Sequence, residues 1–179
     1  MFKKILIGFI VVLALFAVVV SLRPSEFHVE RSASISAPPA VVFEQVNDLH
    51  KWQAWSPWAK MDPAAKVSYE GPTAGTGAVF HWDGNKDVGA GSMTIVDSRP
   101  NELVRFNLEF LKPFKGTNTA TFAFKPQGDQ TKVTWSMDGK NNFIAKAIGL
   151  FMDCDKMIGG QFEKGLAEMK TISEAAAPH

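Results

Sequence analysis

Two residues of a predicted strand, His81 and Asp83, carry side chains that could cooperate in proton transfer. On a strand they share one face while Trp82 takes the other, so the carboxylate could orient the imidazole. Asp83-Gly84 is also a turn signal, because this pair of residues tolerates positive φ. The same residues therefore also fit a surface hairpin that has no chemical role.

Asp155 is a second candidate for acid–base chemistry, since it falls on the apolar stripe of the last predicted helix, between Phe151 and Ile158. A carboxylate there is costly unless it is paired, and Arg105 could pair with it although its strand alternation points away from the core. Facing a cavity, Asp155 would have a raised pKa through desolvation and could act as an acid or hold a polar ligand group. Alternatively, a slightly rotated helix would expose Asp153 and Asp155 together.

Three of the five tryptophans, Trp52, Trp55 and Trp58, follow one another at spacings of three. This spacing places the first two near one helical face, and Pro57 puts the third in turned or extended backbone. Their flat rings could line the mouth of a cavity and stack on an aromatic or sterol-like ligand, with indole N–H groups as donors. Alternatively, they fill the open end of a sheet as core, and a mixture of the two roles fits as well.

Patterns typical of metal, nucleotide and thiol chemistry are missing from the sequence. The 4 histidines show no metal-ligand spacing, so we predict no metal site. Gly75-x-Gly77 and Gly89-x-Gly91 lack the third glycine and the strand–helix setting of a dinucleotide site, and we predict no cofactor. Cys154 lies among acidic residues that would raise its pKa, which argues against a thiolate nucleophile.

The elements that must position these residues begin with an apolar N-terminal segment. Residues 5–22 carry no charge and follow directly after Lys3 and Lys4. As a helix these 18 residues would span ~27 Å, close to the ~30 Å hydrocarbon thickness of a bilayer. We therefore predict that residues 1–23 form a single-pass membrane anchor and that residues 24–26 form a short tether.

A cleaved secretory signal would share the basic start and the apolar core of this segment. No A-x-A cleavage site follows, and Val19-Val20-Ser21 is a poor substitute, which favours a retained anchor. Both readings export the rest of the chain. Because positive charges tend to stay inside, Lys3 and Lys4 predict a cytoplasmic N-terminus and a periplasmic or extracytoplasmic domain in a bacterial envelope, opposed only by Arg23.

The exported part of the chain is weakly acidic. Without residues 1–23 the 19 basic residues fall to 16 against 18 acidic ones, which gives a formal charge of −2. This charge predicts no nucleic-acid partner, because such a partner needs a basic face. The remaining 156 residues suit one domain with one sizeable core, and the single cysteine cannot form an intramolecular disulfide.

Alternating hydrophobicity predicts about seven strands. Apolar and polar residues alternate over 27–35, and between 66 and 137 short alternating runs are separated by turn residues. The clearest run is 103–110, which places four large apolar side chains on one face and polar ones on the other. This pattern predicts an antiparallel meander.

Helical spacing occurs on both sides of this meander. Pro38-Pro39 fits the first turn of a helix, which should bend before Trp52. From Phe143 the apolar residues follow one helical stripe through Thr171, with room for a break, and residues 173–179 form a disordered tail. A helix of this length needs a long surface to lie on. We therefore predict an α+β fold in which a curved seven-stranded antiparallel sheet grips the last helix and leaves a cavity between them.

Three segments add a family likeness: Ile35-x-Ala37-Pro38 followed by Val42-Phe43, Asp48-Leu49-x-x-Trp52-x-x-Trp55-Ser56-Pro57-Trp58, and His81-Trp82-Asp83-Gly84-Asn85. Together with the order of strands and helices they resemble the SRPBCC superfamily, which includes START-like and pollen-allergen-like ligand carriers and polyketide cyclase/dehydrase-like proteins. The resemblance covers residues 27–172 and implies the helix-grip (START-like) fold. It carries over no catalytic residue, because one scaffold serves carriers, hydrolase regulators, aromatases and cyclases.

Three hypotheses for function remain open. The first is a membrane-tethered domain, not an enzyme, that binds a hydrophobic small molecule or lipid between the sheet and the last helix. The second is a cyclase- or dehydrase-like enzyme, which requires at least two of His81, Asp155 and Arg105 to converge on a shared void. The third is an interaction module for another envelope protein, with exposed tryptophans as anchors. For the first, the predicted ligand contacts are Trp52, Trp55, Trp58, Trp82, Phe106, Phe110, Trp135, Phe151, Ile158 and Phe162.

Overall fold

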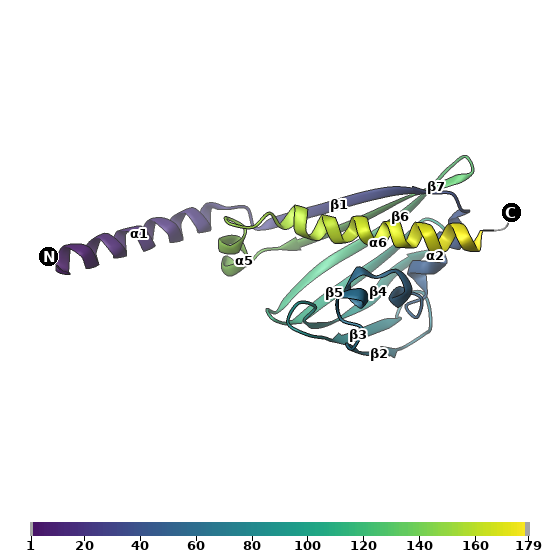
Figure 1. The fold of residues 1–179 in the computed structure, drawn as a ribbon, viewed down its shortest axis with the longest axis horizontal. Coiled ribbons are helices and arrows are strands. Elements are labelled where there is room, and N and C mark those ends of the chain that lie inside the picture. The colour runs from purple at the N-terminus through teal and green to yellow at the C-terminus, as the bar shows by residue number, and fades with distance from the viewer. Residues whose placement is uncertain (1, 178–179) are drawn as a thin grey trace.

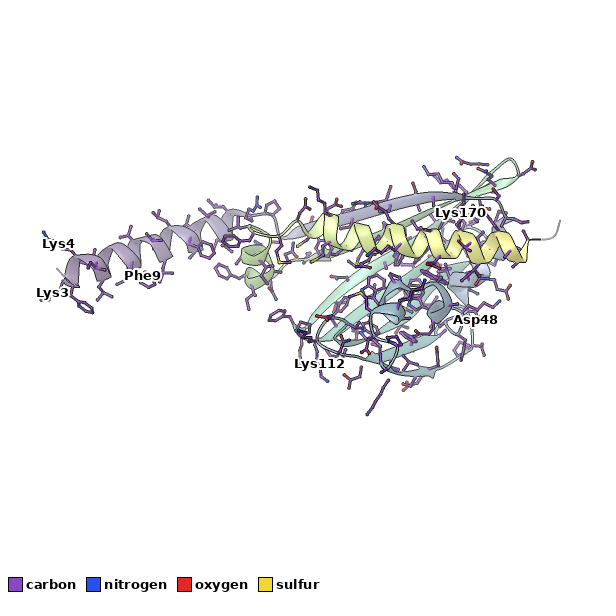
Figure 2. The ribbon with its side chains drawn as sticks, viewed as in Figure 1. Lys3, Lys4, Phe9, Asp48, Lys112 and Lys170 are labelled. Carbon is purple, nitrogen blue, oxygen red and sulfur yellow. The ribbon has the colours of Figure 1, made fainter. Side chains whose placement is uncertain are left out.

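Helix α1 (Phe2–Leu22) projects from the body of the protein in this computed structural model, which describes residues 2–177 (Figure 1). The helix is apolar nearly throughout and is long enough to cross a membrane. Lys3 and Lys4 lie at the end of α1 farthest from the sheet (Figure 2). These properties fit a single-pass anchor and an N-terminal signal sequence alike.

The body of the protein is built on a curved antiparallel sheet of 7 strands. In spatial order they are β1 (Glu26–Ile35), β7 (Gln130–Lys140), β6 (Gly116–Gln127), β5 (Leu103–Lys112), β4 (Ala90–Arg99), β3 (Val79–Asp83) and β2 (Lys66–Glu70). Each strand from β2 to β6 therefore pairs with the next one along the chain, while β1 closes the edge beside β7. This confirms the predicted meander.

Turn residues stand where the sequence pattern places them. Asn101, between β4 and β5, has a φ of 63°, and Gly128, between β6 and β7, has a φ of 60°. Both residue types adopt this left-handed region more readily than others. The predicted Asp83-Gly84 turn is longer, because β3 ends at Asp83 and β4 begins only at Ala90.

Short helices connect β1 to β2 and cover one end of the sheet. They are α2 (Pro39–Asn47), α3 (Trp52–Trp55) and α4 (Pro57–Met61). Pro39 and Pro57 occupy the first turns of α2 and α4, where a missing N–H leaves no helical hydrogen bond unmade. The chain therefore bends just before Trp52, as predicted.

The last helical region is divided in two. Helix α5 (Phe143–Ile148) ends early, and α6 (Cys154–Ala176) begins after a break. Asp153 caps α6, since its side chain accepts a hydrogen bond from the backbone N–H of Lys156 at 3.1 Å. Helix α6 then runs along the sheet and contacts β1, α2, α3 and α4 (Figure 1). The sheet thus grips α6, which confirms the helix-grip fold.

The end of α6 corrects the predicted domain boundary at residue 172. The helix continues through Ala176, and Ser173 is fully buried. Residues 173–176 therefore belong to the folded domain and not to a disordered tail, because the last turn of α6 still packs on the protein. Residues 178–179 of the predicted tail lie outside the described residues.

Two glycines let α6 approach the sheet closely. A Cβ at Gly159 would overlap the guanidinium of Arg31 on β1, and one at Gly165 would lie 2.8 Å from the Trp135 ring on β7. Nothing lies within 4 Å of the corresponding position at Gly160. Close packing thus explains Gly159 and Gly165, which would otherwise weaken the helix.

Candidate ligand cavity

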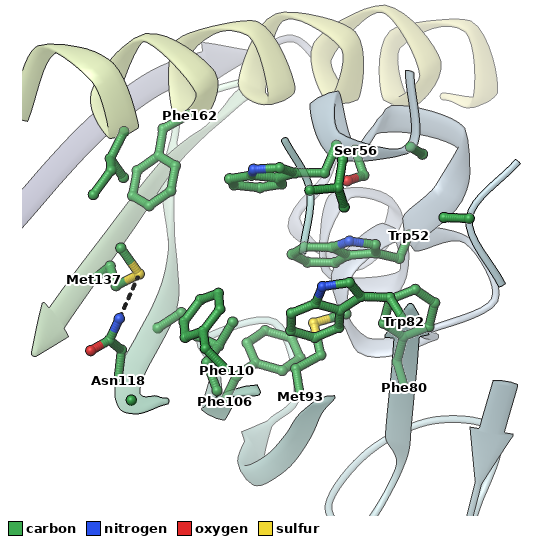
Figure 3. A pocket seen from close by; sticks show the side chains of 18 of the residues that line it. Trp52, Ser56, Phe80, Trp82, Met93, Phe106, Phe110, Asn118, Met137 and Phe162 are labelled. Carbon is green, nitrogen blue, oxygen red and sulfur yellow. Dashed lines mark hydrogen bonds between the residues drawn. The ribbon is translucent and has the colours of Figure 1, made fainter. Parts of the chain in front are cut away.

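A cavity of about 650 Å³ lies between the sheet and helices α3, α4 and α6. Strands β3 to β7 form its floor, and the helices form its opposite wall (Figure 3). Its size falls within the ~300–1,000 Å³ typical of small-molecule sites. The space between sheet and helix that the sequence predicts is therefore present.

Aromatic rings form much of the wall. The rings of Trp135 and Phe162 stack with centroids 4.0 Å apart, which joins β7 to α6. Trp58 meets Trp135 edge to face at 5.8 Å, and Trp52 meets it at 5.9 Å. Each of these rings thus contacts others in the stacked or edge-to-face geometries that aromatic pairs favour.

The three closely spaced tryptophans have different roles. Trp55 is fully buried, and its indole N–H donates to the backbone carbonyl of Gln45 at 2.9 Å. Trp52 and Trp58 line the cavity instead. Of the three interpretations of this cluster, the mixed one describes it: one ring is core and two form the wall.

Eight of the ten residues predicted to contact a ligand line the cavity: Trp52, Trp58, Trp82, Phe106, Phe110, Trp135, Ile158 and Phe162. Trp55 lies behind this wall. Phe151 lies outside the cavity, because it falls in the break between α5 and α6, where the helical stripe is interrupted. It is 80% exposed and faces α1, whose Phe16 ring lies 6.5 Å away.

Sequence reasoning missed several lining residues. Leu108 shares the face of Phe106 and Phe110, and Phe80 shares that of Trp82, so strand alternation could have identified both. Phe114, in the β5–β6 turn, also lines the cavity but follows no periodic pattern. Further lining side chains are Met93, Met137, Ser56 and Asn118 (Figure 3).

A few polar groups stand among these apolar walls. Ser56 is almost fully buried, and Asn118 points its amide toward the Met137 sulfur, 3.9 Å away (Figure 3). The indole N–H of Trp135 is buried and has no hydrogen-bond partner among residues 2–177. A buried donor without a partner is costly, so an acceptor that reached it would be bound favourably.

Asp155 does not face the cavity. It is exposed at the start of α6, and both its oxygens accept hydrogen bonds from Arg31, at 2.9 and 3.2 Å. The same guanidinium binds Glu163 at 2.8 Å. Hydrogen bonding to Arg31 lowers the pKa of Asp155, the opposite of the rise expected in a cavity. The rotated-helix alternative is therefore the right one, and the partner is Arg31 and not Arg105.

His81 and Arg105 also lie away from the cavity. His81 Nε2 is 3.5 Å from the Glu70 carboxylate, and Arg105 is 3.8 Å from Asp97. Asp83 pairs with Lys112 at 2.9 Å and not with His81. None of His81, Arg105 and Asp155 lines the cavity, so the convergence required of an enzyme is not met by these three residues.

Groups of potential metal ligands are the remaining class of site. No group of three or more His, Cys, Asp or Glu side chains is arranged to hold an ion among residues 2–177. Cys154, at the first turn of α6, is a free thiol.

Solved structures share this architecture at low sequence identity. A Chromobacterium violaceum protein matches with a TM-score of 0.61 at 14% identity, over 82% of this chain and 96% of that one. A Mycobacterium smegmatis protein gives 0.58 and 16%, over 83% and 92%. A major latex-like protein from Panax ginseng gives 0.57 and 16%, over 83% and 97%. These likenesses establish the fold alone.

Sequence comparison identifies the family. No curated protein matches the chain. The model of a family described as polyketide cyclase / dehydrase and lipid transport matches residues 26–174, which include the whole sheet and nearly all of α6. Fold and sequence therefore agree with the predicted resemblance, and the chain belongs to the polyketide cyclase / dehydrase and lipid transport family of the SRPBCC superfamily.

Proposed function

We propose that this protein is a membrane-anchored domain that binds a hydrophobic small molecule or lipid in the cavity between the sheet and α6. One observation carries the proposal: four of the five tryptophans, Trp52, Trp58, Trp82 and Trp135, line one cavity of about 650 Å³. Flat apolar rings of this kind suit a ligand with a large apolar surface.

Packing energetics support this proposal. Wall atoms around a void lack contacts on one side, and each lost contact forfeits part of its dispersion energy. A ligand that fills the void restores these contacts and removes its own apolar surface from water. Ser56 and Asn118 could orient one polar group of such a ligand. A molecule that is mostly apolar with a single polar end fits these walls best.

The anchor completes the proposed function. Lys3 and Lys4 stand in the first turn of α1, before its apolar stretch, and the bias of positive charge toward the cytoplasm supports an extracytoplasmic domain. A retained α1 would keep the cavity close to the lipids of that membrane. The description of the family includes lipid transport, which agrees with a lipid-like ligand.

Brominated fatty acid provides a direct test. Bromine quenches tryptophan fluorescence on contact, so the full-length protein in detergent should lose most of its emission as dibrominated stearic acid fills the cavity. Trp55, behind the wall, should retain its emission. Organic extraction of the purified protein followed by mass spectrometry should in addition recover a co-purifying apolar molecule. An absence of quenching together with an empty extract would refute the proposal.

The other two hypotheses have less support. The enzyme hypothesis lacks the convergence of His81, Arg105 and Asp155 on one void. The interaction hypothesis needs exposed tryptophans, whereas the side chains of Trp52 and Trp55 are both buried.

A further inference from the structure

The end of the domain beside α1 carries exposed apolar side chains. We call six of them the apolar rim: Leu111, Phe114, Phe143, Ile144, Phe151 and Met152. Among the described residues outside α1, nearly all exposed large apolar side chains fall within residues 111–114 and 143–157. The exceptions are Met61, Val67 and Val96. Such clustering marks an interaction surface, because soluble surfaces normally scatter these residues.

Contacts with α1 fix where this surface lies. The ring of Phe151 stacks on Phe16 at 6.5 Å, and the Arg23 guanidinium donates to the backbone carbonyl of Gly149 at 3.4 Å. Phe16 stands six residues before Leu22, which places it ~9 Å below the end of the helix. If α1 spans a bilayer, a side chain stacked on Phe16 must itself reach below the membrane surface.

The cavity reaches the surface at the same end, because exposed residues line it there. Exposed residues of the β5–β6 turn, Phe114 to Gly116, line it on one side, and Asn141, Asn142 and Ala145 line it on the other. A second hollow shares Asn141 and Ala145 and extends to Arg23 and Phe151. The opening and the apolar rim therefore lie on one continuous surface beside α1.

We infer that the apolar rim inserts into the outer part of the bilayer that holds α1, so that the cavity opens directly onto lipid. This inference rests on the proposed function. Lys115 and Lys146, which form no ion pair within residues 2–177, flank the rim and can reach lipid phosphates while their stems stay in apolar surroundings. An apolar ligand would then move between membrane and cavity without crossing water.

A depth measurement tests the insertion. The full-length protein with Cys154→Ala and Phe151→Cys carries one spin label at the rim, and a matched variant with Cys154→Ala and Asp129→Cys carries one in the β6–β7 turn at the opposite end of the domain (Figure 1). Both are reconstituted into vesicles of phosphatidylcholine and phosphatidylglycerol. We expect the accessibility of the rim label to oxygen to be at least ten times its accessibility to a water-soluble nickel complex. The turn label should be at least ten times more accessible to the nickel complex than to oxygen.

Two results would overturn the inference. Access of the nickel complex to the rim label equal to that of the turn label would place the rim in water. Protection of the rim label from both reagents would mean that protein covers it, either a partner or a second copy of this chain. As a control, both labelled variants should unfold at the same temperature as the wild-type protein. This result would show that the labels report on the folded protein.

A transfer measurement separates this inference from the proposed function. The variant Phe151→Asp with Met152→Asp should bind a pyrene-labelled fatty acid normally in detergent but deliver it to vesicles at least tenfold more slowly. Val96→Asp, on exposed β4 surface, is the control and should transfer at the wild-type rate. Wild-type transfer by the double variant would contradict the inference, whereas failure of the wild-type protein to bind in detergent would contradict the proposed function.

Discussion

The indole of Trp135 and the ring of Phe162 stack face to face, with centroids 4.0 Å apart and planes inclined by 10°. Trp135 stands on β7 and Phe162 on α6, and both line the cavity. The same contact therefore attaches the helix to the sheet and forms part of the cavity wall. Stability and ligand binding should respond together when this contact is removed.

Phe162→Ala should destabilise the full-length protein strongly. Loss of a buried phenylalanine costs about 3–5 kcal/mol, equivalent to a melting temperature lower by roughly 6–20 °C for a domain of this size. Thermal unfolding in detergent, followed by tryptophan fluorescence, measures the change. Phe114→Ala, which removes an equal but exposed ring, should change stability by less than about 0.5 kcal/mol. Equal shifts in the two variants would show that the stack does not attach the helix.

Alanine at Gly159 and at Gly160 should have opposite effects. Gly160 has free space around it, so Gly160→Ala should stabilise α6 by up to ~1 kcal/mol. At Gly159 the new Cβ would displace the Arg31 guanidinium and break its hydrogen bonds to Asp155 and Glu163. Thermal unfolding of both variants should therefore show a higher midpoint for Gly160→Ala and a lower one for Gly159→Ala.

Removal of the Arg31 side chain tests the cause of this difference between Gly159→Ala and Gly160→Ala. With Arg31→Ala already in place, no guanidinium remains to be displaced. Gly159→Ala should then raise the melting temperature as Gly160→Ala does. A continued loss in this background would mean that another contact excludes the methyl group.

His28 should make stability depend on pH near neutrality. Its Nδ1 lies 2.7 Å from the Asp138 carboxylate, and hydrogen bonding to Asp138 raises the pKa of His28 above 6.5. Because the pKa of His28 is higher in the folded state, protonation of His28 stabilises the fold. This stabilisation is complete below the unfolded-state pKa of 6.5 and is lost as the pH rises through the folded-state pKa. The melting-temperature difference between wild type and His28→Gln should thus be largest below pH 6.5 and shrink above it.

Asp138→Asn provides the control for that titration. Removal of the carboxylate should return the pKa of His28 toward 6.5, which the NMR shift of the imidazole ring protons measures directly. An unchanged His28 titration in Asp138→Asn would show that another group raises the pKa.

Neighbouring residues on β5 offer a matched test of the cavity. Leu108 lines it, whereas Asn107 points to the other side of the sheet and donates to Glu109 at 3.1 Å. Leu108→Lys should weaken binding of dibrominated stearic acid at least tenfold, because it brings a charge into apolar surroundings. Asn107→Lys should bind normally in the same fluorescence titration. Equal affinities would mean that the ligand lies elsewhere.

The fold could be predicted because its determinants are local. Alternation along β5 and β7 and helical spacing in α2 and α6 each depend on neighbouring residues, and turn residues such as Asn101 mark the ends of strands. These patterns also identified most of the aromatic wall, since one face of a strand is read from its period of two.

The break before α6 is the feature that local patterns described least well. Apolar spacing continues through Phe151, yet Asp153 caps a new helix and turns Phe151 toward α1. The sequence offered Asp155 as a residue of the cavity on this same spacing. A rotation of the helix instead brought it to Arg31, more than a hundred residues away along the chain.

By itself, the sequence determined the apolar N-terminal helix, the meander and the closing helix, because periodicity and turn chemistry act between residues close in the chain. Only the tertiary structure decided that Trp55 is core while Trp52 and Trp58 line a cavity, and that Arg31 and not Arg105 pairs with Asp155. Such pairings depend on the angle at which α6 crosses the sheet. Gly159 and Gly165 let α6 approach Arg31 on β1 and Trp135 on β7, and this is packing between segments far apart in the chain.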